Sequence, residues 1–169
     1  MPRTVTRWWK HARHGAFSAR RAFPDALLQR VEQAIQRSEQ AHTAELRFAI
    51  EASLPPTDVW HGRSPRERAL EVFASTGVWD TEANNGVLLY VLLADHAVEI
   101  VADRAAAAKI DDAYWREICT ALSDAYRAGD FEGGTMAAIE RIGRLLAEAF
   151  PRAAGAVDVN ELPNRPLVL

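Results

Sequence analysis

The chain has little of what marks a secreted or membrane-spanning protein. It contains one cysteine, Cys119, among 169 residues, which excludes an intrachain disulfide and a zinc site built from several thiolates. Its central apolar run, Val87 to Leu93, is too short to cross a membrane. The basic N-terminus is not followed by the apolar core of a secretory signal. We therefore expect a cytoplasmic protein without a signal peptide or membrane anchor.

The chain also lacks the short motifs of several enzyme classes. No P-loop, dinucleotide-binding glycine fingerprint or Gly-x-Ser-x-Gly nucleophile motif is present. Cys119 falls on an apolar helical stripe, which favours a place in the core over reactivity. Ser64 stands three residues before Glu67 at a helix start, so we expect it to cap that helix rather than act as a nucleophile. Gly133-Gly134 would either present amides to an anion or allow close packing of a helix on the sheet.

Positive charge is concentrated at the N-terminus, where acid is absent. Residues 1–24 hold six basic residues and no acid, whereas the remainder holds 14 basic and 23 acidic residues. One interpretation is a solvated arm that packs on its own acidic domain. The other is contact with an anionic membrane surface or a protein partner, because paired indoles beside cations suit both. Nucleic acid is not expected, since the acidic body would repel phosphate. The residues assigned to this contact are Arg7, Trp8, Trp9, Lys10 and Arg13.

Residues 87–103 predict a β-hairpin at the centre of the fold. The run Val87 to Leu93 is rich in Val, Leu and Tyr, which is typical of a strand buried on both faces. Asp95-His96 is a two-residue break, and the alternation after it indicates a more exposed second strand. This turn would place two pairs of residues opposite one another: Leu88 with Asp103, and Leu92 with Glu99.

A second strand is predicted over residues 45–52. Leu46, Phe48 and Ile50 alternate with other residues, so one face of this strand is expected to be wet or functional. A helix lies between this strand and the next one. Strand, helix and strand form a crossover unit, which predicts that the two strands run parallel.

Four helices are predicted from apolar spacing, caps and stop signals. They run from Asp25 to Gln40, from Pro65 to a stop at Gly77, from Asp111 or Asp112 to a stop at Gly129, and from Asp130 to a stop at Pro151. The buried stripe of the second is predicted to contain Ala69, Leu70 and Phe73.

These elements predict an α/β fold with a small mixed sheet and helices on both faces. The organisation is a basic N-terminal arm over residues 1–23, an α/β domain over 24–151, and an extended tail over 152–169. The end of the tail, Leu167-Val168-Leu169, is apolar enough to dock on the body.

Two stretches, with the charged hairpin between them, resemble the TPM-domain family. The first is Asn84-Asn85-Gly86-Val87-Leu88-Leu89, and the second is Tyr126-Arg127-Ala128-Gly129-Asp130-Phe131-Glu132-Gly133-Gly134. The resemblance covers about residues 25–151 and implies a three-layer α/β/α sandwich. It also implies a role near membrane or envelope complexes. Some thylakoid-lumen members are described as acid phosphatases, and some members bind calcium.

The chain departs from the family pattern at two places. Asn84 stands where the family usually has Asp, and residues 101–105 replace a glycine-rich segment after the hairpin. The missing signal peptide and anchor make the chain similar to a cytosolic branch of the family. The resemblance therefore implies a non-catalytic binding module that acts with a protein partner, peripheral to the inner face of the membrane. The alternative is a metal-assisted acid phosphatase.

Oxygen-bearing side chains are expected to gather at the end of the hairpin opposite the turn. Carboxylate and amide oxygens are the ligands that calcium and magnesium prefer, and a metal-dependent phosphatase would use such a cluster. The alternative is a polar loop whose Asp and Asn side chains cap backbone groups. The candidate ligands are Asp80, Glu82, Asn84, Asn85 and Asp103.

Two other groups have metal-binding side chains. Glu39, His42 and Glu45 would share a face of one helix and bind zinc, or lie at a frayed and solvated helix end. His11 and His14 would also suit a metal, but the cations around them disfavour it.

Overall fold

The computed structural model describes residues 7–9, 11, 16–153, 155 and 160–169, with the side chains of 16–18 left aside. Its sheet has four strands in the order β3 (Ala97–Ala102), β2 (Val87–Leu92), β1 (Leu46–Glu51) and β4 (Leu167–Val168). Strand β1 runs parallel to β2 and to β4, and β2 runs antiparallel to β3. The predicted hairpin and the predicted parallel pair are therefore both confirmed.

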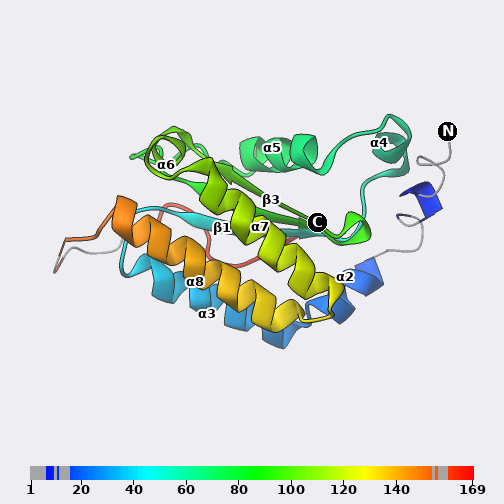
Figure 1. Cartoon of the computed structure of the whole chain (residues 1–169), viewed down its shortest axis with the longest axis horizontal. Coiled ribbons are helices and arrows are strands. Elements are labelled where there is room, and N and C mark those ends of the chain that lie inside the picture. The colour runs from blue at the N-terminus through cyan, green and yellow to red at the C-terminus, as the bar shows by residue number, and fades with distance from the viewer. Residues whose placement is uncertain (1–6, 10, 12–15, 154, 156–159) are drawn as a thin grey trace.

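Helices cover both faces of this sheet, as Figure 1 shows. One face carries α3 (Asp25–Glu39), α7 (Asp112–Arg127) and α8 (Phe131–Ala149), and the other carries α5 (Pro65–Ser75). The expected α/β sandwich is thus present. Helix α5 also begins as predicted, because the Ser64 side chain accepts the Glu67 N–H and the Glu67 carboxylate accepts the Ser64 N–H.

The sequence does not predict two short helices. Helix α4 (Pro56–Trp60) begins at the second of two consecutive prolines, and proline at the first helical position suits a helix start. Helix α6 (Arg104–Lys109) is a run of alanines capped by Asp103. Each is too short to produce an apolar period.

The hairpin turn differs from the two-residue turn expected at Asp95-His96. The connection runs from residue 93 to residue 96, with a short 3-10 turn over Leu93–Asp95 and a left-handed φ of 50° at His96. Because the register moves by two residues, every side chain keeps the face that the alternation predicts. The corrected partners are Val101 for Leu88 and Ala97 for Leu92, in place of Asp103 and Glu99.

Both faces of β1 are buried, which corrects the expectation of a wet face. The face toward α5 carries Glu51, whose carboxylate accepts hydrogen bonds from Tyr90 Oη at 2.6 Å and from Arg68 Nε at 2.8 Å. Since a buried carboxylate is stable only when paired and hydrogen-bonded, Arg68 from α5 makes this position possible. The alternation in the strand is correct, but it does not show that a helix covers the second face.

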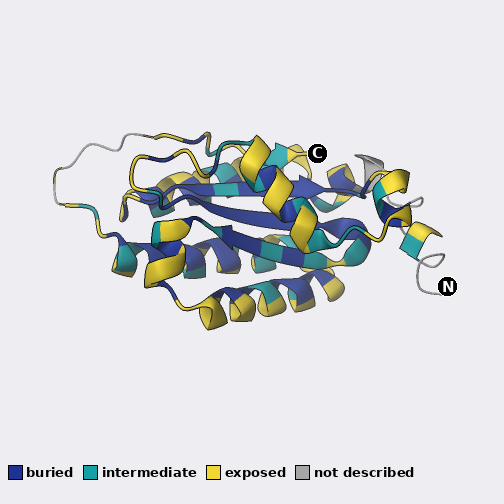
Figure 2. Ribbon diagram, turned by 90° about the horizontal axis from the view of Figure 1, so that it is seen from above, coloured by how far each residue is buried: buried dark blue, intermediate teal, exposed yellow. Residues whose placement is uncertain are grey.

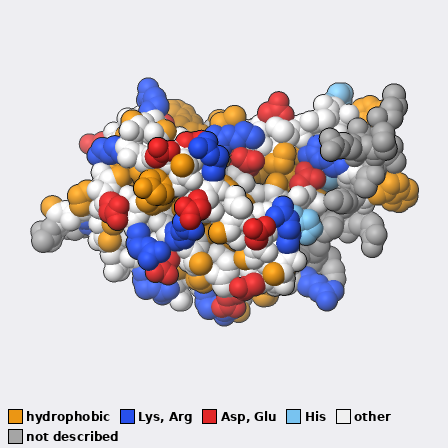
Figure 3. All heavy atoms as spheres, in the orientation of Figure 1, with side chains coloured by type: hydrophobic (Ala, Val, Ile, Leu, Met, Phe, Trp, Pro, Cys, Tyr) orange, Lys and Arg blue, Asp and Glu red, His pale blue; other side chains and the backbone are white. Residues whose placement is uncertain are grey.

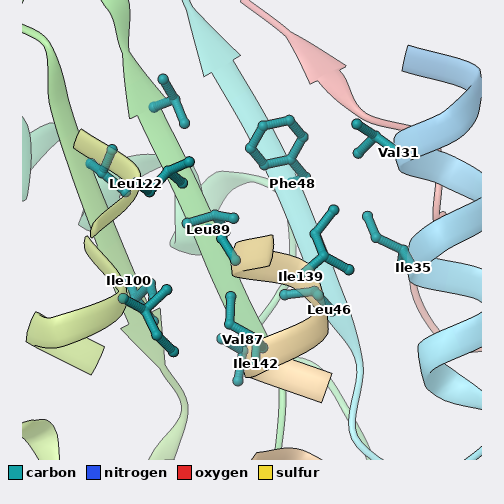
Figure 4. Packing of buried hydrophobic residues seen from close by; sticks show 14 of the residues in the cluster. Val31, Ile35, Leu46, Phe48, Val87, Leu89, Ile100, Leu122, Ile139 and Ile142 are labelled. Atoms are coloured by element: carbon teal, nitrogen blue, oxygen red, sulfur yellow. The ribbon is translucent and has the colours of Figure 1, made fainter. Parts of the chain in front are cut away.

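The main apolar core lies between the sheet and the layer of α3, α7 and α8. Figure 4 shows Phe48 and Leu89 on the strands and Ile35 and Ile139 on the helices around this core. Figure 2 shows the strands buried along most of their length and the exposed residues on the outer sides of the helices. One predicted core residue is wrong: Leu70 of α5 is 47% exposed, and Val72 is buried instead.

Both ends of the chain take part in the packing. Ala19, in helix α2 (Ala16–Ala22), and Phe23 are buried, and the Phe23 ring lies 5.9 Å from that of Phe48. The packed part therefore begins before residue 24, the expected start of the domain. The C-terminal end docks as expected, with the Leu169 N–H donated to the Ile50 carbonyl at 2.9 Å.

Candidate functional site

The open end of the hairpin (residues 80–86 and 103–104) contains the five candidate metal ligands. Asp103 caps α6, because its Oδ1 accepts the Arg104 N–H at 2.7 Å. Asn84 has a left-handed φ of 51°, and its Oδ1 accepts Arg104 Nη2 at 2.7 Å. Asn85 donates its Nδ2–H to the Thr43 carbonyl at 2.9 Å. Of these three side chains, Asp103 caps local backbone, Asn84 binds an arginine, and Asn85 bonds to backbone 42 residues away in sequence.

Asp80 and Glu82 do not complete a metal centre. Both are exposed, and the backbone N–H of Glu82 donates to Glu161 Oε2 at 2.8 Å. In the described part of the chain, no three His, Cys, Asp or Glu side chains form a group that could hold a metal ion. The three acids of the candidate set, Asp80, Glu82 and Asp103, therefore form no such group among the described residues.

Two oxygens at the open end lack a hydrogen-bond partner in the part of the chain that the structure describes. Asn85 Oδ1 and Asp103 Oδ2 are buried and have no hydrogen-bond partner among the described groups. Their residues are close in the structure, since the Asp103 N–H donates to the carbonyl of Gly86 at 2.8 Å. An unpaired buried oxygen costs about 1–3 kcal/mol, and calcium and magnesium prefer such oxygens. Within the candidate set, these two atoms are the buried oxygens that remain unpaired among the described groups.

The hairpin tip (residues 93–96) holds the N-terminal segment. Arg7 donates to Asp95 Oδ2 through Nη2 at 2.7 Å and through Nε at 3.0 Å. His11 lies with Nε2 at 3.1 Å from Asp95 Oδ1, and its Nδ1 accepts the Leu54 N–H at 2.9 Å. Because Nδ1 is an acceptor, the ring carries its proton on Nε2 and donates it to Asp95. Arg7 and His11 thus fasten the segment at two points.

The pKa of Asp95 reflects this arrangement. Burial raises this pKa, but the hydrogen bonds and charge of Arg7, with a smaller contribution from His11, outweigh burial and hold the pKa below its usual value. The carboxylate is therefore ionised at neutral pH. The side chains of Arg7 and Asp95 are both mostly buried, so solvent screens this pair less than a surface ion pair.

Three tryptophans are exposed at the end of the molecule where this segment lies. The exposed fractions are 38% for Trp8, 60% for Trp9 and 72% for Trp60. Trp60 ends α4, which begins two residues after Leu54, the residue that binds His11. Figure 1 shows α4 and the N-terminal segment at the same end of the long axis, and Figure 3 shows hydrophobic side chains on the surface there. We call this region, defined by Trp8, Trp9 and Trp60, the tryptophan end.

The remaining members of the predicted contact set are Lys10 and Arg13, which lie outside the described residues, as does His14. Sequence reasoning missed Asp95 and Trp60. Asp95 was interpreted only as part of a turn, yet an acid at a strand end is a candidate partner for a basic arm. For Trp60 the sequence offers no comparable signal.

The Glu39, His42 and Glu45 group is buried, so the interpretation as a frayed and solvated helix end is wrong. Glu39 Oε1 accepts the Leu46 N–H at 3.0 Å, and Glu45 Oε2 accepts the Leu162 N–H at 3.2 Å. His42 makes hydrogen bonds through both ring nitrogens. All three side chains therefore hold neighbouring backbone segments in place.

Cys119 and the glycine pair have structural roles. Burial, helped by the charge of Glu99, raises the pKa of the Cys119 thiol to about 12, so the reactive thiolate is not populated at neutral pH. A Cβ on Gly134 would lie 2.6 Å from the Cβ of Ala125, and the Gly133 N–H is donated to Asp130 Oδ1 at 2.8 Å. The close packing is present, but it joins helix α8 to helix α7 rather than a helix to the sheet, so the expected packing partner is wrong.

Comparison with known proteins agrees with this architecture. A family model described as the TPM domain matches residues 19–145, beginning at the buried Ala19. Among solved structures, the chain is similar to the NMR structure of the BA42 protein from the psychrophilic bacterium Bizionia argentinensis. The two share 26% sequence identity with a TM-score of 0.73, over 85% of this chain and 92% of BA42. No curated protein matches the chain. None of the helices in the described residues has the length and apolar character needed to cross a membrane.

Proposed function

Because the chain belongs to the TPM-domain family, we propose that it is a non-catalytic binding module whose tryptophan end contacts a protein partner. The observation that carries this proposal is the exposure of Trp9 and Trp60 on a segment and a helix that are both fixed to the folded body. Exposed tryptophans on a rigid support are typical of the residues that dominate protein–protein binding. Large apolar side chains held in solvent without a partner are otherwise unfavourable.

A protein partner suits this end better than an anionic membrane surface. Membrane contact by a basic arm depends on cations that are free to meet anionic lipid. Arg7, directly before Trp8, is instead bound to Asp95 inside the molecule, and Arg63, three residues after Trp60, is paired with Asp58 and Glu71, so neither of these two cations is free. The family resemblance supports a cytoplasmic site of action at or near the inner face of the membrane, where the partner would lie.

The open end of the hairpin supports an ion better than it supports turnover. Asn85 Oδ1 and Asp103 Oδ2 would hold calcium or magnesium, which would supply positive charge at this end. A phosphatase would also need several converging carboxylates, and Asp80, Glu82 and Asp103 form no such group among the described residues. An assay with p-nitrophenyl phosphate and added magnesium or calcium should show no turnover above buffer. Metal-dependent turnover that disappears in Asp103→Asn would promote the phosphatase alternative.

The partner contact is tested by site-specific crosslinking. A photoreactive residue is placed at position 9 or 60 of the chain in cells that produce it, and the protein that becomes crosslinked is identified. This protein is then purified, and its affinity for the wild-type chain is measured by titration. We expect the combined variant Trp9→Ser with Trp60→Ser to bind this protein at least about tenfold more weakly, the scale of a contact hot spot. Trp79→Ser is the matched control, because Trp79 is 53% exposed at the open end of the hairpin and should leave the affinity unchanged.

Sedimentation with vesicles that contain phosphatidylglycerol distinguishes contact with an anionic membrane from contact with a protein partner. We expect no cosedimentation above the level of neutral vesicles. Strong cosedimentation that depends on Trp9 would contradict the protein-partner proposal, and so would equal affinity of the crosslinked protein for the wild type and the combined variant.

A further inference from the structure

We propose that a cavity beneath the hairpin tip binds a small carboxylic acid with an apolar body. The cavity has a volume of about 260 Å³ and lies between α2, the hairpin tip and the start of α8. We call it the tip cavity. The residues that shape it for the argument are Arg21, Ala22, Leu93, His96, Tyr126 and Phe131.

Aromatic rings form a firm apolar wall in the tip cavity. The centroids of Tyr126 and Phe131 lie 5.1 Å apart, and the two rings lie 5.9 Å and 5.8 Å from Phe23, which is buried. The Tyr126 hydroxyl is engaged with Thr135 Oγ1 at 2.7 Å. Tyr126 therefore offers its ring rather than its hydroxyl to a ligand, and the wall suits an aliphatic chain or an aromatic ring.

The charge at the tip cavity has one sign. Arg21 lines it, no acidic side chain lines it, and Arg21 makes no ion pair with a carboxylate in the residues that the structure describes. The neighbouring acid on the hairpin tip is Asp95, and its oxygens already bind Arg7 and His11. A guanidinium beside an apolar cavity is a ready partner for a carboxylate, which it binds through a charge-assisted hydrogen bond.

The rim of the tip cavity is fixed rather than adaptable. His96 takes a left-handed φ of 50°, and its carbonyl accepts the Ser123 hydroxyl at 2.9 Å. This bond ties the backbone of the hairpin tip to α7. A volume of about 260 Å³ lies below the range of drug-sized sites, which limits the ligand to a small acid.

The test is calorimetric titration of the full chain with octanoate, and with octanamide as an uncharged analogue of the same shape. We expect octanoate to bind and octanamide to bind about tenfold more weakly, because it lacks the charge that meets Arg21. Arg21→Glu should weaken octanoate by about tenfold or more. Arg20→Glu is the matched control: Arg20 is exposed, adjacent in sequence and absent from the cavity lining, and this variant should bind octanoate as the wild type does.

Two further measurements keep the result specific to the tip cavity. Octanoate should shift the ring signals of Tyr126 and Phe131 in NMR spectra, and Ala22→Phe, which fills the cavity, should abolish binding while cooperative unfolding is retained. The combined variant Trp9→Ser with Trp60→Ser should bind octanoate with the affinity of the wild type. The test of the tip cavity is therefore independent of the test of the partner contact. No binding of octanoate, equal affinity for octanamide, or equal losses in Arg20→Glu and Arg21→Glu would each overturn it.

Discussion

At the open end of the β2–β3 hairpin Asp103 caps the helix that follows it, whereas at the hairpin tip Asp95 binds Arg7 and His11, which are 88 and 84 residues away in sequence. Both acids lie beside strand ends and both are mostly buried. Asp103 stabilises the adjacent helix, whereas Asp95 holds a segment that is distant in sequence against the domain. The tip is thus where the chain orders an additional surface, the tryptophan end.

The difference between the two ends shows how similar residues acquire different roles. At the open end, Asp103 finds the backbone N–H of the next residue, which is typical of Asp in loops. At the tip, a short 3-10 turn leaves Asp95 with its carboxylate directed to another part of the chain. A long-range pair of this kind fixes exposed side chains that would otherwise be mobile, which is why we place function there.

The largest expected effect comes from breaking the strand that joins the two ends. Leu89 lies in the core of β2 (Figure 4), and Leu89→Asp would bury an unpaired carboxylate. The cost is several kcal/mol, comparable to the whole stability of a domain. We expect no cooperative thermal unfolding, measured by circular dichroism. Leu70→Asp on the exposed side of α5 is the control and should unfold normally. Cooperative folding of Leu89→Asp would refute the central-strand assignment.

The strands and long helices could be predicted because their signals are local. Apolar runs, alternation and the Ser64 capping box each act within a few residues, and the structure confirms them. The register of the hairpin could not be predicted, since His96 takes a left-handed conformation that its residue type only tolerates. The burial of Glu51 was missed because its partner Arg68 comes from α5, 17 residues away in sequence.

The site was predicted less well than the fold, for the same physical reason. Asp80, Glu82 and Asp103 have the right chemistry for a metal, but sequence does not show which acids already have backbone partners. Trp8 and Trp9 were selected as contact residues because basic residues flank them in the sequence, and their exposure agrees with a contact role. The pairing of Arg7 with Asp95 joins residues 88 apart, and no local pattern reports it.

A smaller effect is expected from releasing the N-terminal segment at the tip. Asp95→Asn weakens hydrogen bonds to a charged group, and we expect a loss of about 1–2 kcal/mol in the free energy of unfolding, measured with urea. Trypsin should also cleave the basic arm faster. Asp80→Asn at the open end is the control, because Asp80 is exposed and forms no ion pair among the described residues. Its effect on the free energy of unfolding should stay within about 0.5 kcal/mol. Equal effects of the two variants would remove the contrast between the ends.

The pH dependence of stability is a second test of the pairing at the hairpin tip. The pKa of Asp95 is lower in the folded chain than in the unfolded chain, so the stability that its ionised form contributes is fully present above the unfolded value of about 4. It is lost as the pH falls through the folded value. The stability gap between wild type and Asp95→Asn, followed by urea unfolding at several pH values, should therefore shrink in acid. The dependence should weaken in Arg7→Gln, and a gap that stays constant in acid would contradict the assigned pairing.

The smallest expected effect concerns the ion at the open end. At a calcium concentration equal to its dissociation constant, an ion bound only to the native state adds about 0.4 kcal/mol, a rise of about 1 °C in Tm for a chain of this size. Asp103→Asn should abolish the rise, whereas Glu82→Gln should retain it, because Glu82 is exposed and Asp103 Oδ2 is buried without a partner. A rise that depends on Glu82 would restore the larger cluster.

The most direct test of a partner contact at the tryptophan end uses the five tryptophans as reporters. The indole N–H signals of the 15N-labelled chain are followed by NMR while the crosslinked and purified partner is added. The account predicts that the signals of Trp8, Trp9 and Trp60 shift or broaden, while that of Trp79 at the open end stays unchanged. Perturbation of Trp79, with the three signals of the tryptophan end unmoved, would place the contact at the opposite end of the hairpin and contradict the account.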